Sequence, residues 1–185
     1  MKLKPMDLDA IFDLLHTRGG AAYLGEDITQ VEHALQAATL AEEAGEDAHL
    51  IVACLLHDVG HLVVLEDGSD ESAGDDRHEV IGAKLLAAVL PPGVTEPIRL
   101  HVEAKRYLVT KDPGYRATLS AASEYSLQAQ GGPMSDDACA RFEAEPHAGA
   151  AIALRRYDEA AKVVDASTLP LEHFRHFAQA CILRT

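Results

Sequence analysis

Apolar residues recur along the chain at the three- and four-residue intervals of amphipathic helices. In the first such segment Leu8, Ile11, Phe12 and Leu15 share one helix face, and Gly19 follows as a stop signal. Segments that alternate apolar and polar residues, as half-buried strands do, are almost absent. The pattern therefore predicts an all-α fold.

The expected second helix has clear boundary signals. Asp27 with Gln30 and Thr29 with Glu32 both match a capping box, so the helix is expected to begin near Asp27 or Thr29. Gly45 is placed as its C-terminal stop.

A third helix is expected from about residue 47 through the letters LIVACLLHDVGH, which are apolar on nearly every side, as in the centre of a bundle. The acidic, Gly- and Ser-rich run EDGSDESAGDDR then predicts a mobile surface loop. Further helices are expected at residues 78–89, 95–109, 113–130, 135–144, 146–162 and from about 170. We predict one domain over residues 1–185, built as a single-domain bundle of about eight helices.

The composition of the chain limits which classes of binding partner are expected. The chain has 16 Lys+Arg against 30 Asp+Glu, a formal charge of −14, which disfavours a nucleic-acid groove or an anionic membrane surface. Charges interrupt the apolar residues of the first segment, so neither a secretory leader nor a membrane span is expected. The three cysteines form no CxxC pair, which disfavours a disulfide framework. A cytoplasmic protein is expected, and its oligomeric state has no signal in the sequence.

The chain also has ten histidines, and the most informative string is His57-Asp58-Val59-Gly60-His61 at the end of the apolar third helix. Burying a carboxylate and two imidazoles is costly unless they are hydrogen-bonded or bound to a cation. Neighbouring helical side chains point about 100° apart, so His57 and Asp58 reach one ion only at a special backbone position, such as a frayed turn permitted by Gly60. An isolated His-Asp pair is more often a hydrogen-bonded patch at a helix end.

Four further residues of ligand type lie on separate expected helices: His33, His78, His101 and Asp158. Each alone is more often a core or surface residue. Together with the His-Asp pair they favour a metal site, because bundles build such sites from inward-facing side chains of several helices.

The order of these residues, a histidine, a His-Asp pair and a final aspartate, resembles the H…HD…D pattern of the HD-domain superfamily over nearly the whole chain. Members with two metals add two histidines before the last aspartate. The resemblance implies two ligand sets that share one carboxylate: His33, His57, Asp58 and Asp158 for one ion, and Asp58, His78 and His101 for the other. Such ligands suit iron, manganese or zinc.

Longer strings resemble a narrower group, the mixed-valence di-iron oxygenases that cleave 2-amino-1-hydroxyethylphosphonate and are relatives of myo-inositol oxygenase. The strings are AAYLGEDITQVEH, HDVGH, RHEVIGA, EPIRLHVEAKRYL, QGGPMS and ALRRYDEA. That group carries Tyr and Glu ahead of the first ligand, matched by Tyr23 and Glu26, and a Lys after the fourth histidine, matched by Lys105. The resemblance implies an Fe(II)/Fe(III) pair, O2 as co-substrate and a small organophosphonate whose C–P bond breaks to give phosphate and glycine or an N-methylated glycine.

Helical spacing places three donors beside the expected ligands: His61, Lys105 and Arg155. It also places three polar residues on one stripe of a helix: Ser123, Ser126 and Gln130. In the family, positions matching the stripe help to hold the phosphonate, whereas the residues alone fit a solvated face about equally well. The resemblance further implies that Glu26 pairs with the substrate ammonium and that Tyr23 covers an open metal position until substrate displaces it. A core aromatic and a helix N-terminal charge are the plain alternatives.

Two other functions compete with the oxygenase. A metal-dependent HD phosphohydrolase acting on a nucleotide or phosphomonoester uses the same ligands, but hydrolysis requires neither the pair formed by Tyr23 and Glu26 nor the QGGPM segment. A non-catalytic HD module is expected to lack ligands, and all six positions are filled here. Whether the substrate amine is free or N-methylated stays open.

Overall fold

The computed structural model describes residues 7–23, 25–64 and 77–183. Within these residues the chain forms eleven α-helices and one short 3-10 helix, and its only extended pairing is an isolated bridge between Ala22 and Thr29. The elements are α1 (Leu8–Arg18), α2 (Gln30–Glu43), α3 (Ala48–Leu56), α4 (Val59–Val64), α5 (His78–Leu86), α6 (Pro92–Lys111), α7 (Pro113–Arg116), α8 (Ala121–Ala129), α9 (Asp136–Glu143), α10 (Ala148–Ala160), η3 (Leu171–Phe174) and α11 (Arg175–Cys181). The predicted all-α class is confirmed.

The start of α2 follows the capping box centred on Thr29, the later of the two expected starts. The Thr29 hydroxyl accepts a hydrogen bond from the Glu32 amide at 3.3 Å, and the Glu32 carboxylate accepts one from the Thr29 amide at 2.7 Å. The two bonds satisfy amides that have no partner within the helix. After the helix ends, Gly45 takes a φ of +78°, as a helix stop requires.

The described residues form eleven α-helices, more than the nine segments expected from the sequence, because two of those segments are divided. The apolar third helix ends at Leu56 and resumes as α4 at Val59, so the turn between them holds His57 and Asp58. The expected helix at residues 113–130 is likewise divided into α7 and α8. The acidic run at 66–77 lies outside the described residues except for its last member.

Gly60 is needed for a different reason from the frayed turn expected from the sequence. It lies inside α4, and a Cβ at this position would stand 2.0 Å from the carbonyl oxygen of His78 at the start of α5. The missing side chain therefore lets α4 and α5 pack closely enough to bring both histidine-bearing segments together.

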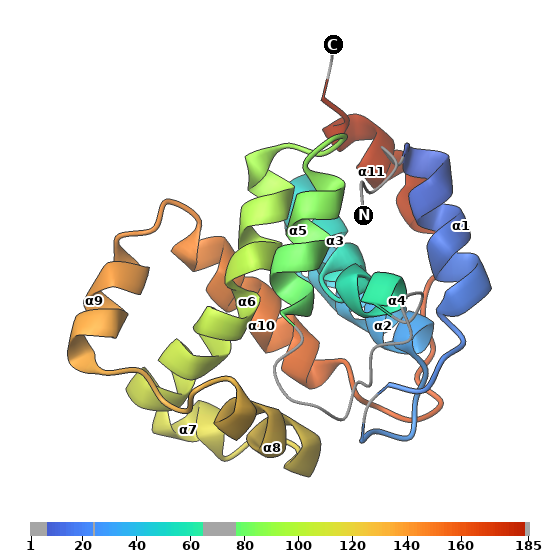
Figure 1. Cartoon of the computed structure of the whole chain (residues 1–185). Helices are drawn as coiled ribbons and strands as arrows, with labels where there is room; N and C mark the ends of the chain where they lie inside the picture. Colours follow the sequence, from blue (N-terminus) through green and yellow to red (C-terminus); the bar gives the residue numbers. More distant parts are fainter. Residues whose placement is uncertain (1–6, 24, 65–76, 184–185) are drawn as a thin grey trace.

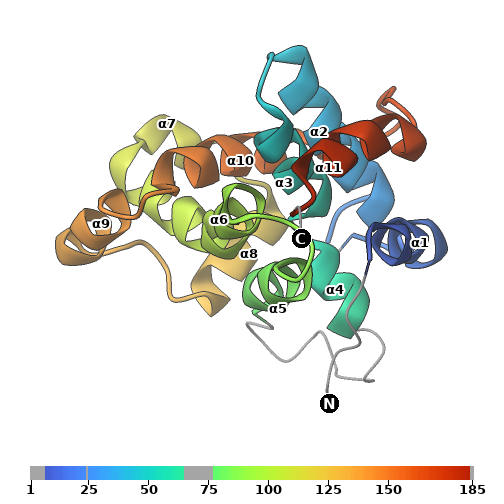
Figure 2. The same ribbon diagram turned by 90° about the horizontal axis from the view of Figure 1, so that it is seen from above.

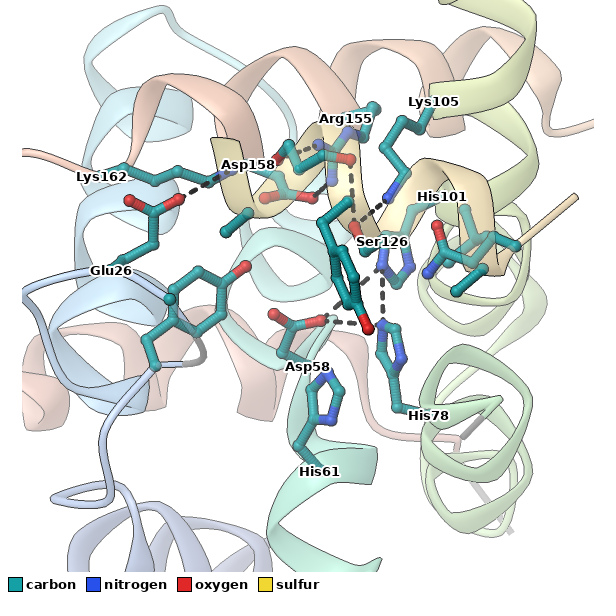
Figure 3. A pocket seen from close by; sticks show the side chains of 18 of the residues that line it. Glu26, Asp58, His61, His78, His101, Lys105, Ser126, Arg155, Asp158 and Lys162 are labelled. Carbon is teal, nitrogen blue, oxygen red and sulfur yellow. Dashed lines mark hydrogen bonds and ion pairs between the residues drawn. The ribbon is translucent and has the colours of Figure 1, made fainter. Parts of the chain in front are cut away.

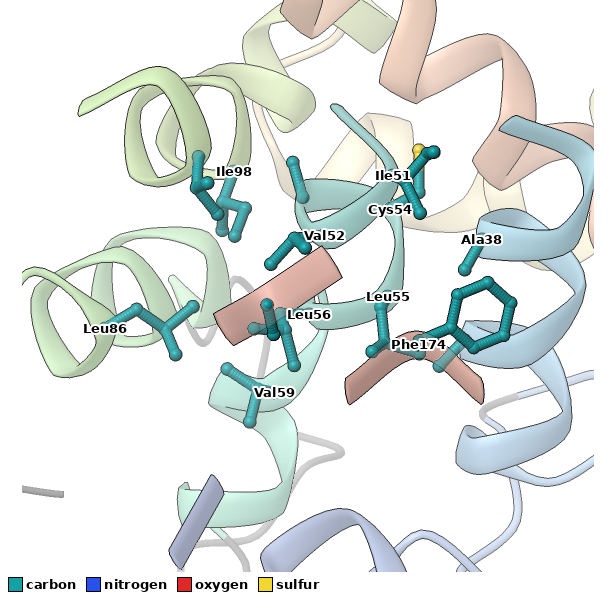
Figure 4. Packing of buried hydrophobic residues seen from close by; sticks show 14 of the residues in the cluster. Ala38, Ile51, Val52, Cys54, Leu55, Leu56, Val59, Leu86, Ile98 and Phe174 are labelled. Carbon is teal, nitrogen blue, oxygen red and sulfur yellow. The ribbon is translucent and has the colours of Figure 1, made fainter. Parts of the chain in front are cut away.

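Helix α3 forms the centre of the main core (Figures 1 and 2). Every residue from Leu50 to Leu56 is at most 7% exposed, and α2, α6, α10 and α11 surround the helix. Figure 4 shows Leu55 near Phe174 from the 3-10 helix, and Leu56 between α3 and Leu86 of α5. Full burial of each such side chain stabilises the fold by about 1.5–3 kcal/mol.

Helices α7, α8 and α9 lie on the side of the molecule away from α1 and α11 (Figure 1). Smaller apolar clusters join them to the long helix α6, one around Leu108, Tyr115 and Leu127 and another around Leu100 and Phe142. Helices α6 and α10 thus connect the main core to a wall that α8 forms. Among the described residues, each helix is too short or too polar to serve as a transmembrane span.

Candidate metal centre and substrate pocket

A pocket of about 640 Å³ lies between the main core and α8. Side chains from α4, α5, α6, α8, α10 and the loop before α2 line it (Figure 3). Fourteen metal and substrate residues are expected or implied from the sequence. Two of them, His33 and His57, are fully buried. The other twelve line the pocket: Tyr23, Glu26, Asp58, His61, His78, His101, Lys105, Ser123, Ser126, Gln130, Arg155 and Asp158.

The first group of ligand atoms belongs to α2, the α3–α4 turn and α10. His33, His57 and Asp58 each offer one ligand atom within 4.8 Å of the others. Asp158 Oδ1 lies 3.4 Å from His33 Nε2, and it is buried without a hydrogen-bond partner. These four side chains, expected together from the sequence, therefore converge on one point.

The tautomers of His33 and His57 suit a cation at that point. Their Nδ1 atoms lie 2.8 Å from the carbonyl oxygens of Ala161 and Cys54, and a carbonyl only accepts, so each Nδ1 carries the proton. In the neutral rings the two Nε2 lone pairs then face each other at 3.1 Å. This arrangement is repulsive until a cation lies between the rings, so the residues fit a metal ion.

The second group shares Asp58 with the first. Asp58 Oδ1 lies 3.3 Å from His78 Nε2 and 3.7 Å from His101 Nε2, whereas Oδ2 lies 3.4 Å from His57 Nε2. The Nε2 atoms of His78 and His101 are 3.2 Å apart, and His101 Nδ1 donates to the carbonyl of Ile98 at 2.7 Å. One carboxylate oxygen therefore faces each group, which is the geometry of a bridge.

The surroundings favour the ligand forms of Asp58, Asp158 and His101, whereas burial lowers the pKa of His57 but the nearby Asp58 and Asp158 raise it overall. Burial raises the pKa of Asp58 and of Asp158, but the combined effect of nearby donors and cations, led by His57 for the first and Arg155 for the second, outweighs it, and both pKa values fall well below the usual range. Burial, followed by the nearby His78, lowers the pKa of His101 well below its usual value. Ionised carboxylates and neutral imidazoles are the forms that bind metal. The six residues His33, His57, Asp58, His78, His101 and Asp158 are called the ligand cluster below.

The opposite side of the pocket is charged. Lys105 Nζ donates to Ser126 Oγ at 2.8 Å, and burial, followed by the positive charge of Arg155, lowers the pKa of Lys105 to about 7. Ser123 Oγ lies 2.9 Å from Glu159 Oε2 and accepts from Lys162 Nζ at 2.6 Å. We call Lys105, Ser123, Ser126, Glu159 and Lys162 the charged wall.

Arg155 connects the charged wall to the ligand cluster. Its guanidinium donates to Asp158 and, at 2.5 Å, to Glu159, and its Nε donates to the Tyr115 hydroxyl at 2.7 Å. A fourth contact, at 3.3 Å, reaches Ser123 Oγ. Most donors of Arg155 are therefore engaged within the protein, and the side chain holds Asp158 in place.

Two expected residues flank the cluster as stacked rings. Tyr23 stacks on His33 at 4.0 Å with 19° between the planes, and His61 stacks on His78 at 3.9 Å with 18°. Burial, followed by the negative charges of Asp58 and Asp158, raises the pKa of Tyr23, so its hydroxyl keeps its proton. Gln130 also lines the pocket, and its Oε1 is buried without a hydrogen-bond partner.

Sequence reasoning missed Glu159, Lys162 and Tyr125. Glu159 and Lys162 have a usable signal, because they follow Arg155 at spacings of four and then three residues, which bring charged side chains of a helix and its end close together. Tyr125 lines the pocket mouth although its side chain is 77% exposed. A single exposed aromatic has no signal in the sequence.

The buried His-Asp turn, completed by histidines of neighbouring helices, is the arrangement of an HD protein, and the chain belongs to the HD domain family, whose sequence profile matches residues 31–139. Similar curated proteins extend the match beyond that range. [1-Hydroxy-2-(trimethylamino)ethyl]phosphonate dioxygenase (glycine-betaine-forming) of Leisingera caerulea is 42% identical over 95% of this chain and 88% of its own length. Hydroxymethylphosphonate dioxygenase of Gimesia maris is 41% identical over 94% of this chain and 87% of its own. An uncharacterized protein of Acanthamoeba polyphaga mimivirus is 38% identical over 92% and 79%.

Proposed function

We propose that this protein is a di-iron oxygenase that uses O2 to break the C–P bond of a small 1-hydroxyphosphonate. The observation that carries the proposal is the shared carboxylate of Asp58, with one oxygen toward each of two histidine groups, at the edge of a pocket with a charged wall. Two relatives with these dioxygenase names, each more than 40% identical over nearly the whole chain, support it.

The ligand cluster divides into two sets in this proposal. His33, His57, Asp58 and Asp158 would hold one iron, and Asp58, His78 and His101 the other. The bound Fe(II)/Fe(III) pair would supply the redox chemistry with O2. For 2-amino-1-hydroxyethylphosphonate the C1–H and C–P bonds break, and one O2 per substrate balances the products glycine and phosphate.

The protein's own residues bind and orient the substrate. Lys105 and Ser126 line the pocket and would hold phosphonate oxygens, and a bound dianion would favour the charged form of Lys105. His61 would donate to the same group from the other side. Arg155 acts as a positioning residue, because its bonds fix Asp158 and Glu159.

An oxygen electrode tests the proposal. The purified, iron-loaded protein should consume O2 with a 1-hydroxyphosphonate and release an equal amount of phosphate, and EPR should show a mixed-valence di-iron signal. Phosphate release from a phosphomonoester under anaerobic conditions, without O2 uptake on any hydroxyphosphonate, would instead establish the phosphohydrolase.

A further inference from the structure

Lys162 lies just beyond the end of α10, and its ammonium faces the pocket between two carboxylates. Its Nζ is 3.0 Å from Glu159 Oε2 and 3.9 Å from Glu26 Oε1, and it donates to Ser123 Oγ. The side chains of Lys162 and Glu26 are only 10% and 16% exposed. Figure 3 shows the two side by side at one end of the pocket, away from His78 and His101. Glu26 therefore already has a cationic neighbour in the ligand-free pocket.

The pairing leaves Glu26 incompletely satisfied. The 3.9 Å separation from Lys162 exceeds hydrogen-bond range, and Glu26 Oε1 is buried without a hydrogen-bond partner. Lys162 has closer acceptors in Ser123 and Glu159. A ligand cation that reaches Glu26 Oε1 thus gains a free acceptor, but it also comes close to the Lys162 ammonium.

We propose that Lys162 is a specificity-determining residue that weakens the preference of this pocket for hydroxyphosphonates with a cationic substituent. The inference rests on the proposed function. A substrate ammonium at Glu26 is attracted by that carboxylate and repelled by Lys162, and both interactions are strengthened by burial. A substrate without a cation leaves the pair of Glu26 and Lys162 intact, so the pocket accepts both kinds.

The presence of a cationic substituent matters because known substrates of this class differ in it. One named relative acts on a phosphonate with a trimethylamino group, and another on hydroxymethylphosphonate, which has no amine. Lys162 also attracts the phosphonate end, but that attraction is common to both substrates. The ratio of their dissociation constants therefore isolates the effect at Glu26.

Anaerobic calorimetric titration of the iron-loaded protein with 2-amino-1-hydroxyethylphosphonate and with hydroxymethylphosphonate measures this ratio. Lys162→Gln should raise the preference for the aminated substrate about tenfold, the effect of one partly buried charge. Lys162→Arg, which keeps the charge, should stay near the wild-type ratio. Lys111→Gln is the matched control, because Lys111 forms an ion pair of the same 3.9 Å length, with Asp136, on the exposed surface.

If Lys162→Gln weakens the binding of both substrates equally, the inference is overturned, because a lysine with a purely structural role would give that result. A shift of the preference toward hydroxymethylphosphonate would overturn it as well. Should Lys162→Gln fail to fold, Glu26→Gln provides the reciprocal test and should lower the preference for the amine. If the wild-type protein binds and oxidises neither substrate, the proposed function itself fails; if it oxidises them and the ratio does not move, only the role of Lys162 fails.

Discussion

The ligand cluster and the charged wall face each other across one pocket, but different contacts hold them. Histidines of the cluster are held by hydrogen bonds from Nδ1 to main-chain carbonyls, that of Cys54 for His57 and that of Ile98 for His101. Residues of the wall are fixed by one another, as Ser123 is by Glu159 and Lys162. Carbonyls of a helix are part of its main chain, whereas side chains can exchange partners.

This difference matches the chemistry of the two sides. A metal centre needs ligands held at fixed positions, and main-chain anchoring supplies that. A pocket that admits an anionic group needs charges that change partners when the group arrives, and the shared contacts of Glu159 with Arg155, Lys162 and Ser123 supply that. Substitutions in the ligand cluster should therefore reduce activity more than substitutions in the charged wall.

The largest effect should come from the shared carboxylate. Asp58→Ala removes an oxygen from both ligand groups, so iron content should fall to background and kcat/KM by at least about 10³-fold. His78→Ala removes a ligand from one group alone and should leave about half of the iron. Metal analysis by mass spectrometry measures both.

His16→Ala and Asp136→Ala replace exposed residues of the same types far from the pocket and should keep wild-type iron content. Full iron content in Asp58→Ala would show that the two groups do not share this carboxylate.

The same difference determines what the sequence could predict. The ligand cluster was predicted because the order of its residues resembles the H…HD…D pattern, and two of its supporting contacts, His57–Cys54 and His101–Ile98, join residues only three positions apart. In the charged wall, Ser123 meets Glu159 and Lys162 from 36 and 39 positions away. Such pairs depend on how α8 packs against α10, which no local pattern records, and the wall was therefore predicted only in part.

The fold was predicted at the level of class and of most helices. The division of the apolar third helix was missed because His57 keeps right-handed helical dihedrals, φ −60° and ψ −33°, and neither a proline nor a positive φ marks the turn. The role of Gly60 was also misread. Its contact is with the main chain of α5, which is brought near only by tertiary packing.

Adding a side chain at Gly60 should have an intermediate effect, which is on stability. The Cβ of Gly60→Ala would meet the carbonyl group of His78 at 2.0 Å, so α4 and α5 must separate. The free energy of unfolding should fall by about 3 kcal/mol. Urea denaturation of the metal-free protein measures this loss without a contribution from metal binding.

Gly149→Ala is the matched control, because no atom lies within 4 Å of a Cβ at that position. Its stability should be unchanged or rise by up to about 1 kcal/mol. Equal stability of the two variants would show that the approach of α4 to α5 is adjustable, and that the ligand cluster is less rigid than its main-chain contacts imply.

The smallest effect should come from the charged wall, through Lys105. Its pKa of about 7 in the empty pocket means that the ammonium is largely lost as the pH rises above 7. A bound phosphonate favours the charged form, so binding above pH 7 takes up a proton and the dissociation constant rises with pH. Below pH 7 the ammonium is already present and this dependence disappears.

Anaerobic titration with hydroxymethylphosphonate from pH 6 to 9 separates this contribution from ionisation of the phosphonate itself, which is common to all variants. Wild-type affinity should fall on the order of tenfold more over this range than that of Lys105→Met, whose side chain does not titrate. Lys105→Arg keeps its charge throughout and should follow the shallower profile of Lys105→Met at higher affinity. Parallel profiles for wild type and Lys105→Met would mean that Lys105 is not where the phosphonate charge is met, and the wall would then act through Ser123 and Lys162 alone.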